Sequence, residues 1–416
     1  MLAMRTMLPG AAILMLAGAL MPIQAQANRS WPPPSLAPSA TNRFRVDVIN
    51  VAPGEPIYSS WGHTALRILD NREGFDYVFD YGVFRFDDDF VFRFLQGKPA
   101  YMLWVSSLQR TLFRYSGEQR TVYAQQIFMS DEMAEELLNR MIIDALPANR
   151  EFLYDHFYDN CTTRVRDIVD QLLDQEPSAR LSTQATGRSL RDESMDLLLD
   201  SPALWFGTNL IMGKLVDEPI TAWQQMFLPL QLKDGLESFR AGSVAEGPVS
   251  IGPIQIIYDG QNLRTVRPAP WIFFAACLLM LIIAFAWPAL RPSSQRAPLM
   301  HRLTRYSWHI LSGLIGIILL LLWLATDHRS THNNLNTLAF FPPSLIWPLF
   351  DLTRFGRDPK KAIFTQEFLL LPGCIGLALE FSGLWPQFSW PYLGLALVIQ
   401  GLIVLGMRRM RAVENH

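Results

Sequence analysis

The stretch YDNCTTRVRDIVDQLL, residues 158–173, predicts an amphipathic helix that begins at a cysteine. Its apolar face repeats every three or four residues and consists of Val165, Ile168, Val169, Leu172 and Leu173. Asp159 or Asn160 is the expected N-cap, which puts Cys161 in the first turn. The unpaired N–H groups there favour a thiolate and could hold an oxyanion. Cys161 is therefore either a primed nucleophile or a small buried hydrophobic residue, as free cysteines often are.

The rest of the chain divides by composition. It has 416 residues, 50% of them hydrophobic, and a formal net charge of −2, which gives no sign of nucleic-acid binding. Residues 1–27 have the apolar core and the small residues before the cleavage point that are typical of a secretory signal peptide, with an uncleaved anchor as the alternative. Residues 28–42 are rich in proline and predict a stiff linker. Residues 43–267 have the composition of one globular domain.

After Pro268 the composition changes to long apolar runs, which predict a membrane domain over residues 268–411 and a short tail, 412–416. Runs of roughly 20 uncharged residues are long enough to cross a bilayer. Five spans are expected, with four as the alternative because two prolines interrupt the third. The expected spans are 271–290, 306–326, 335–350, 368–385 and 392–407.

Basic residues test this count. They are concentrated after the first, third and last spans, whereas the loops between hold one arginine. By the positive-inside rule, five spans place every basic loop in the cytoplasm and the 43–267 domain outside. With an even number of spans, the basic residues after the last span would lie outside the cytoplasm, against this rule.

A candidate partner for Cys161 lies upstream. Residues 44–51 predict one strand, His63 starts a second and residues 76–81 form a third. Alternation places His63 on the less apolar face of its strand, and Gly62 before it allows a backbone or a ligand to approach closely. A lone histidine is usually structural.

A catalytic role for this histidine would require a third polar group beside it. An imidazole whose other nitrogen is held by such a group can activate a cysteine nucleophile. Asp80 and Tyr81, on the neighbouring predicted strand, are the candidates for that group. Asp80 as a plain turn or edge residue is the alternative.

Several long motifs, in order along the chain, resemble those of the Lnb N-terminal periplasmic domain family. The order of a strand histidine, a DYG strand and a helix-opening cysteine also resembles the circularly permuted papain-like group, which includes LRAT-like acyltransferases and relatives of the NlpC peptidases. The tail of membrane spans resembles the Lnb architecture too. The motifs are PGEPIYSSWGHTALRI (53–68), FDYGVFRF (79–86), the helical region FVFRFLQGKPAYML (90–103), ANREFLYDHFYDNCTTRVRDIV (148–169) and MFLPLQL (226–232).

The resemblance implies an α+β, permuted papain-like domain in the periplasm, followed by an α-helical domain in the bacterial inner membrane. It implies a lipoprotein N-acyltransferase, in which a thiol takes an acyl chain from a phospholipid and passes it to the N-terminal amine of a lipoprotein. Cys161 would be the nucleophile and His63 the general base, with Asp80, Tyr81 and Asn160 in support, and no cofactor is needed. Two rivals stay open: a cysteine hydrolase of the envelope (peptidase, amidase or lipase) on the same dyad, and a non-catalytic envelope protein.

A second polar cluster follows the second expected span. The loop TDHRSTHNNLN, residues 326–336, carries His328, His332, Asn333 and Asn334 on the same predicted side of the membrane as Cys161. Histidines four residues apart can bind zinc, but no Cys or Glu lies near to complete a site, so no metal is expected. A polar rim that meets lipid headgroups or orients substrate is one interpretation, and a solvated loop is the other.

Overall fold

The computed structural model describes residues 42–84, 89–241, 248–260, 268–351, 353 and 356–415. The expected signal peptide, 1–27, and all but the last residue of the expected linker, 28–42, lie outside the described residues. The described part of the chain belongs to one unit, Pro38–His416.

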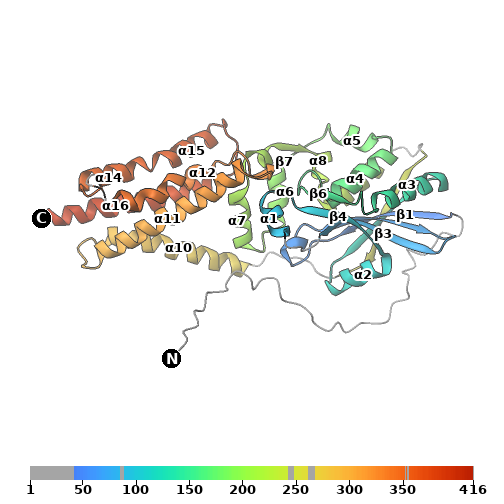
Figure 1. The fold of residues 1–416 in the computed structure, drawn as a ribbon, viewed down its shortest axis with the longest axis horizontal. Coiled ribbons are helices and arrows are strands. Elements are labelled where there is room, and N and C mark those ends of the chain that lie inside the picture. Colours follow the sequence, from blue (N-terminus) through green and yellow to red (C-terminus); the bar gives the residue numbers. More distant parts are fainter. Residues whose placement is uncertain are drawn as a thin grey trace, which may run out of the picture. The chain divides into compact units, whose positions relative to one another are not determined.

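An antiparallel sheet forms the centre of the N-terminal domain (Figure 1). Among the described residues it has seven strands, in the order β6-β4-β3-β2-β1-β5-β9. Their bounds are β1 (Phe44–Val51), β2 (His63–Asp70), β3 (Phe75–Phe84), β4 (Ala100–Ser107), β5 (Val122–Phe128), β6 (Glu151–Leu153) and β9 (Ser250–Tyr258). A smaller sheet pairs β7 (Ala185–Ser189) with β8 (Pro219–Thr221). The α+β class is therefore confirmed, and β1 to β3 follow the predicted strands closely.

The helices of this domain lie on both sides of the sheet (Figure 1). They are α1 (Phe90–Leu95), α2 (Leu108–Gly117), α3 (Asp131–Asp144), α4 (Cys161–Leu172), α5 (Glu176–Leu181), α6 (Leu190–Asp196), α7 (Pro202–Ile211), α8 (Ala222–Gln225) and α9 (Pro229–Ala241), with short 3-10 helices η2 (Ile57–Ser59) and η3 (Lys214–Asp217).

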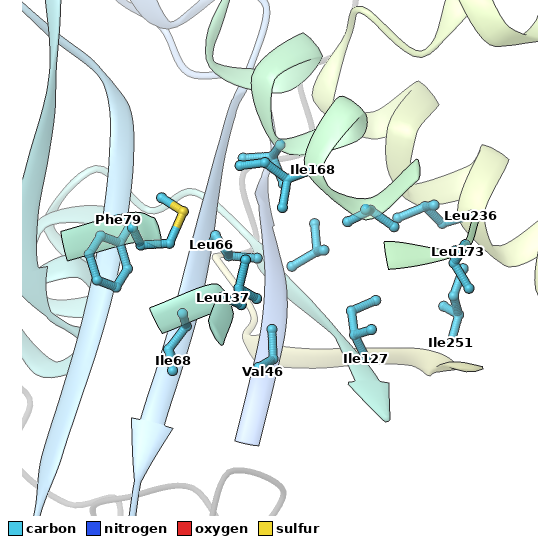
Figure 2. Close-up of a cluster of buried hydrophobic side chains, with 14 of the residues drawn as sticks. Val46, Leu66, Ile68, Phe79, Ile127, Leu137, Ile168, Leu173, Leu236 and Ile251 are labelled. Carbon is cyan, nitrogen blue, oxygen red and sulfur yellow. The ribbon is translucent and has the colours of Figure 1, made fainter. Parts of the chain in front are cut away.

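One face of the sheet packs against α3, α4 and α9. Strand alternation sends Val46, Leu66 and Phe79 to this side, where they meet Leu137 of α3 and Ile168 of α4 (Figure 2). The predicted apolar stripe of α4 thus faces the core, and Cys161 belongs to the same cluster. Burial of this stripe fixes α4, and with it the thiol, against β2 and β3.

The opposite face of the sheet is buried as well. Arg67, which shares this face with His63, is only 1% exposed and bonds to Asp47 at 2.8 Å and Asp76 at 2.7 Å. Helix α2 packs against β3 and β4 here, with Tyr115 buried. His63 therefore lies in a covered layer of paired charges and aromatic rings.

The motif over residues 90–103 is helical only in its first half. Helix α1 ends at Leu95, and Gly97 follows with φ +79°, a left-handed conformation that ends helices. Pro99 cannot continue the helix, and the residues after it form β4 instead. The expectation of a helical region through residue 103 was wrong.

The C-terminal region is helical. Within the described residues, four helical segments are long and apolar enough to cross a membrane: Pro268–Leu290, Ala297–Leu324, Pro359–Phe381 and Trp390–Glu414. They comprise α10 (Pro268–Leu290), α11 (Ala297–Leu324), α14 (Pro359–Phe368) with α15 (Leu371–Phe381), and α16 (Trp390–Glu414). Each coincides with or overlaps an expected span, although α11 and α14 begin nine residues earlier than expected because the helices continue past their apolar runs.

The expected span 335–350 is not one long helix. It consists of α12 (Asn336–Ala339), η5 (Pro342–Ile346) and α13 (Trp347–Phe350), because Pro342 and Pro343 cannot continue a helix that begins before them.

These short helices run antiparallel along α11. Near the end of α11, Thr331 bonds to the carbonyl of Leu322, while Asp351 accepts a hydrogen bond from Tyr306, nearer its start. Gly313 leaves room for Leu345, whose backbone nitrogen lies 2.5 Å from where a Cβ would be. The chain thus covers most of the length of α11 without forming one helix, and five crossings stay a prediction.

Candidate functional site

Cys161 is the first residue of α4, and Asn160 is its N-cap. Asn160 Oδ1 accepts hydrogen bonds from the N–H groups of Thr162 at 2.7 Å and Thr163 at 2.9 Å. Thr163 Oγ1 accepts the Asn160 N–H at 2.8 Å in return, which completes a capping box. The box fixes the start of the helix, and Cys161 is 8% exposed at its positive end.

The cap also limits what the helix end can do. The N–H groups of Thr162 and Thr163 are occupied by Asn160, so they cannot hold an oxyanion as expected from the sequence. The N–H of Cys161 itself takes part in none of the described side-chain or loop hydrogen bonds. The N–H of Cys161 is therefore the one in the first turn of α4 that could bind an oxyanion.

His63 and Asp80 face each other across neighbouring strands. Nε2 of His63 lies 2.7 Å from Oδ1 of Asp80. The same oxygen accepts the backbone N–H of Gly82 at 2.7 Å, so the carboxylate is held in place independently of the imidazole. With Nε2 on Asp80, Nδ1 is the nitrogen left for the thiol of Cys161.

The charges of this group change the protonation of its members. Burial by itself lowers the pKa of His63, but the charge and hydrogen bond of Asp80, together with the charges of Tyr115 and Cys161, outweigh it and hold that pKa well above the ordinary value. Burial also raises the pKa of Cys161, yet the charge of His63 and its hydrogen bond, together with the N–H of Thr64, leave that pKa lowered. The directions favour a thiolate beside an imidazolium.

Gly82 makes room for the pair. A Cβ on Gly82 would lie 3.0 Å from Nδ1 of His63 and 3.1 Å from Oδ1 of Asp80, and closer still to Cε1 of the ring. No other residue type fits there without moving the imidazole. The DYG motif contained this signal, but only strand pairing shows what the glycine faces.

Tyr101 and Tyr154 are residues of the site that the sequence did not indicate. Their rings stack at 4.1 Å, on β4 and just after β6. Burial, followed by the negative charge of Cys161, raises the pKa of Tyr101 to about 12 and that of Tyr154 well above its ordinary value. Tyr154 directly precedes Asp155, whose backbone pairs with that of Asp159, two residues before Cys161, which places this pair of rings near the start of α4.

Two expected supporting residues have structural roles. The hydroxyl of Tyr81 donates to Asp144 of α3 at 3.2 Å, and no described hydrogen bond joins it to His63. The amide of Asn160 donates to the carbonyls of His156 at 2.6 Å and Phe227 at 3.1 Å. Of the predicted supporting groups, the structure brings Asp80 alone to the imidazole.

A chain of hydroxyls joins α4 to β2. Thr64 Oγ1 donates to Asn50 Oδ1 at 2.9 Å and lies 3.1 Å from Thr162 Oγ1. Because Thr64 has only one proton to give, the Thr162 hydroxyl donates to it. This chain fixes the register between the cysteine helix and the histidine strand.

The second polar cluster lies at the junction of the two domains. His328 Nε2 lies 2.7 Å from the carbonyl of Phe94, while His332 Nε2 lies 3.0 Å from that of Thr326. Asn333 is exposed in a left-handed conformation, with φ +56°. The two imidazoles use different carbonyls, so they do not converge on one ligand.

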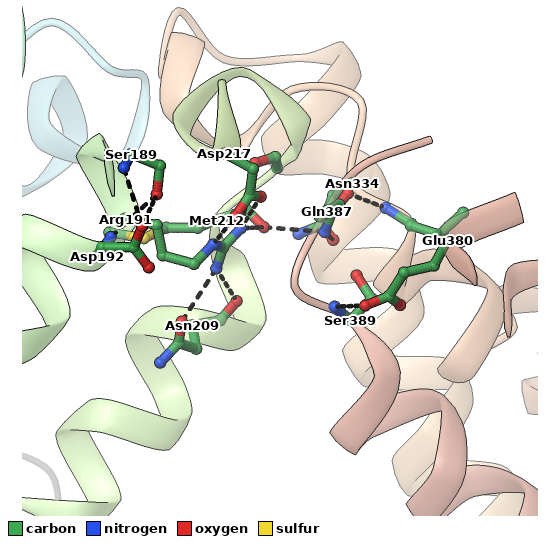
Figure 3. A network of polar contacts seen from close by, with 12 residues as sticks. Ser189, Arg191, Asp192, Asn209, Met212, Asp217, Asn334, Glu380, Gln387 and Ser389 are labelled. Carbon is green, nitrogen blue, oxygen red and sulfur yellow. Dashed lines mark hydrogen bonds and ion pairs between the residues drawn. The ribbon is translucent and has the colours of Figure 1, made fainter. Parts of the chain in front are cut away.

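Asn334 is buried in a network that links the domains. Its Nδ2 donates to the carbonyl of Leu210 on α7 at 2.9 Å, and its Oδ1 accepts from Gln387 at 2.9 Å. Gln387 also donates to the carbonyl of Met212, which accepts from Arg191 as well (Figure 3). The loop therefore connects the two domains rather than forming a free polar rim.

In the described parts of the chain, no group of three His, Cys, Asp or Glu side chains is placed to hold a metal ion.

Two domains in series, one built on a sheet and one made of helices long enough to cross a bilayer, define a membrane protein with an N-terminal globular domain. Residues 39–192 match the Lnb N-terminal periplasmic domain, and residues 263–406 match the Lnb transmembrane domain. The chain belongs to the Lnb family, and its N-terminal domain is periplasmic. No curated protein and no solved structure matches it.

Proposed function

We propose that this protein is a thiol acyltransferase of the bacterial inner membrane. It would move an acyl chain from a phospholipid to the N-terminal amine of lipoproteins. The observation that carries the proposal is the imidazole of His63, which is bonded to Asp80 at 2.7 Å and whose charge and hydrogen bond lower the pKa of the Cys161 thiol. Cysteine nucleophiles are activated by such an imidazole held by a third group. The order of His63, the DYG strand and Cys161 along the chain is also the feature from which the relation to permuted papain-like acyltransferases was proposed.

In the first step, the thiolate of Cys161 attacks an ester carbonyl of the phospholipid. The N–H of Cys161 stabilises the oxyanion of the tetrahedral intermediate. As the ester C–O bond breaks, the imidazolium of His63 gives its proton to the departing alkoxide. The products are a lysophospholipid, a thioester on Cys161 and a neutral His63.

In the second step, the amine of the lipoprotein attacks the thioester. Neutral His63 takes the proton that the amine loses, while the C–S bond breaks and the thiolate returns. The product is an amide, and the thiolate–imidazolium pair is restored. Asp80 keeps its charge throughout, orients the ring and stabilises the imidazolium in both steps.

Hydrolysis on the same site differs only in the acceptor. If water replaces the amine, the thioester gives a free acid and the enzyme is a hydrolase. The membrane domain favours transfer, because it would tether the domain that carries the thiol to the bilayer, whereas a peptidase of the envelope has no need of so much anchored apolar helix.

Mass spectrometry of lipoprotein N-termini tests the proposal. Cells that carry the gene should have N-acylated lipoproteins, and deletion should leave the amine free. A copy with Cys161→Ala should fail to restore acylation, whereas one with Cys374→Ala, a cysteine of α15, should restore it. Full N-acylation in the deletion strain, with no other transferase present, would refute the proposal.

A further inference from the structure

Helix α1 carries exposed apolar side chains that the fold of the domain leaves uncovered. Val91, Phe92 and Leu95 share one face of the helix and are 61%, 63% and 58% exposed. Phe90, on the opposite side, is buried. A periplasmic domain would not keep such a face in water unless something covers it.

This face lies at the end of a membrane-spanning helix. Helix α11 ends at Leu324, and three residues later the N–H of Asp327 donates to the carbonyl of Gln96 at 2.8 Å. Gly97 allows the close approach, because a Cβ there would lie 2.5 Å from the nitrogen of His328. Lys98 forms an ion pair with Asp327 at 3.1 Å. Helix α1 is therefore held where α11 leaves the bilayer.

An aromatic row leads from α1 to the thiol. It consists of Phe94, Phe90, Phe84, Tyr101 and Tyr154, and its successive ring centroids are 6.2, 5.2, 5.2 and 4.1 Å apart. The last ring, Tyr154, directly precedes Asp155, whose backbone pairs with that of Asp159, two residues before Cys161. Packed aromatic side chains thus run from the membrane end of the domain toward the start of α4, where Cys161 lies.

We propose that Val91, Phe92 and Leu95 insert into the outer leaflet of the membrane that α11 spans, and that the aromatic row guides a lipid acyl chain from there to Cys161. The bilayer is the occupant because the face is continuous with a helix that must already end in the headgroup layer. Lys98 suits that layer, since its stem can lie along apolar surface while its charge remains in water. The second half of this inference rests on the acyltransferase function, and the first half does not.

The position of α1 can be measured directly. The full-length protein, with Cys161, Cys277 and Cys374 changed to alanine, is given a spin label at Phe92→Cys and placed in phospholipid nanodiscs. A label in the leaflet should be relaxed strongly by oxygen, which dissolves in lipid, and weakly by a water-soluble nickel chelate.

Phe128→Cys is the matched control for this label. Phe128 is 45% exposed at the end of the sheet away from α1. Its chain neighbour Ile127 aligns across the sheet with Ser107, the last residue of β4, whereas α1 precedes Ala100, the first residue of β4. The aligned residues are Ile127, Val46, Ile68, Tyr77 and Ser107. Equal exposure of both labels to the nickel chelate would overturn the inference, and so would shielding of Phe92→Cys from both reagents, which would indicate a protein partner.

Acylation kinetics test the guiding role. The variant with Phe92→Ser and Leu95→Ser should form the Cys161 thioester at least about tenfold more slowly from bilayer phospholipid, because it loses apolar contact with the leaflet. Its acylation by water-soluble p-nitrophenyl acetate should match that of the wild type and of Phe128→Ser. An equal loss with both donors would overturn the guiding role, since it would mean damage to the site itself.

The two claims can fail separately. A wild-type protein that no phospholipid acylates would refute the proposed function, while the spin label would still decide where α1 lies. If the spin label at Phe92→Cys were exposed to water while phospholipid acylated the protein normally, only the role of α1 would be refuted.

Discussion

The charge and hydrogen bond of His63 set the pH range in which Cys161 reacts. The lowered pKa of Cys161 means that its thiolate persists down to a lower pH than that of a free cysteine, whose pKa is about 8.5. The rate of alkylation by iodoacetamide should therefore reach its plateau at a pH below about 8.5. It should decline only in more acidic solution, where the sulfur is protonated. His63→Ala should remove the plateau and slow labelling at neutral pH.

Asp80→Asn should shift the pH profile of the alkylation rate toward higher pH. Loss of the negative charge lowers the pKa of His63, so the thiolate loses its cationic partner at a lower pH and its own pKa rises, because this loss exceeds the relief of the weaker repulsion between Asp80 and the thiolate. Asp144→Asn removes a carboxylate that bonds to Tyr81 instead, and should leave the profile unchanged. An unshifted profile in Asp80→Asn would show that His63 does not depend on this carboxylate.

Gly82→Ala should inactivate the site without unfolding the domain. The added methyl group would displace the imidazole from Asp80, and alkylation at neutral pH should slow by about tenfold or more, as expected when a thiolate loses its ion pair. Gly207→Ala, on α7, meets nothing within 4 Å and serves as the control. Labelling at the wild-type rate in folded Gly82→Ala would contradict the geometry.

At the level of residues, local patterns revealed part of the site. Helix periodicity placed Cys161 in a first turn, and strand alternation separated His63 from the apolar residues around it. Gly82, Tyr101 and Tyr154 were out of reach, because their roles depend on which strands pair. Asp80 and Tyr81 are adjacent in sequence, and only the structure shows that they take different partners.

The start of α4 depends on one amide side chain. Asn160→Ala removes the cap and leaves two backbone carbonyls without their donor, so thermal unfolding should show a loss of about 2 kcal/mol or more. Asn160→Asp keeps the acceptor oxygen but loses the donor, and should cost less. Equal stability of Asn160→Ala and the wild type, measured by circular dichroism in detergent, would contradict this account of the helix.

At the level of elements, periodicity predicted the strands near residues 44–81 and α4 well, because each has one apolar face and one more polar face. It failed at residues 90–103, where Gly97 and Pro99 end a helix that the motif suggested would continue. Residues 335–350 are apolar enough for a span, but their prolines divide them, and only packing against Gly313 and Gly316 of α11 shows the path they take.

The number of crossings determines which side of the membrane each loop faces. A reporter that is active only in the cytoplasm should be active when fused after Arg411 and silent when fused near Thr331. The reason is the distribution of basic loops together with the path of residues 335–350 along α11. The reverse pattern would separate the 326–336 loop from the periplasmic domain, which its hydrogen bonds to Leu210 and Phe94 do not allow.

For the whole molecule, composition alone indicated an exported domain followed by a membrane domain. It could not show that the two are joined by buried hydrogen bonds. Asn334, which the sequence placed either in a polar rim at the membrane surface or in a solvated loop, reaches the carbonyl of Leu210 together with Asn336. Such contacts join residues more than a hundred positions apart, and no local pattern predicts them.

The central claim is a thioester on Cys161, and the intact mass of the purified protein tests it most directly. Incubated with phospholipid but without an amine acceptor, the full-length protein should gain the mass of one acyl chain, which hydroxylamine should release. Cys161→Ala should gain nothing, and Cys277→Ala should behave as the wild type. Absence of the added mass, together with Cys161-dependent cleavage of a peptidoglycan-type peptide, would show that the protein is a hydrolase and contradict the account.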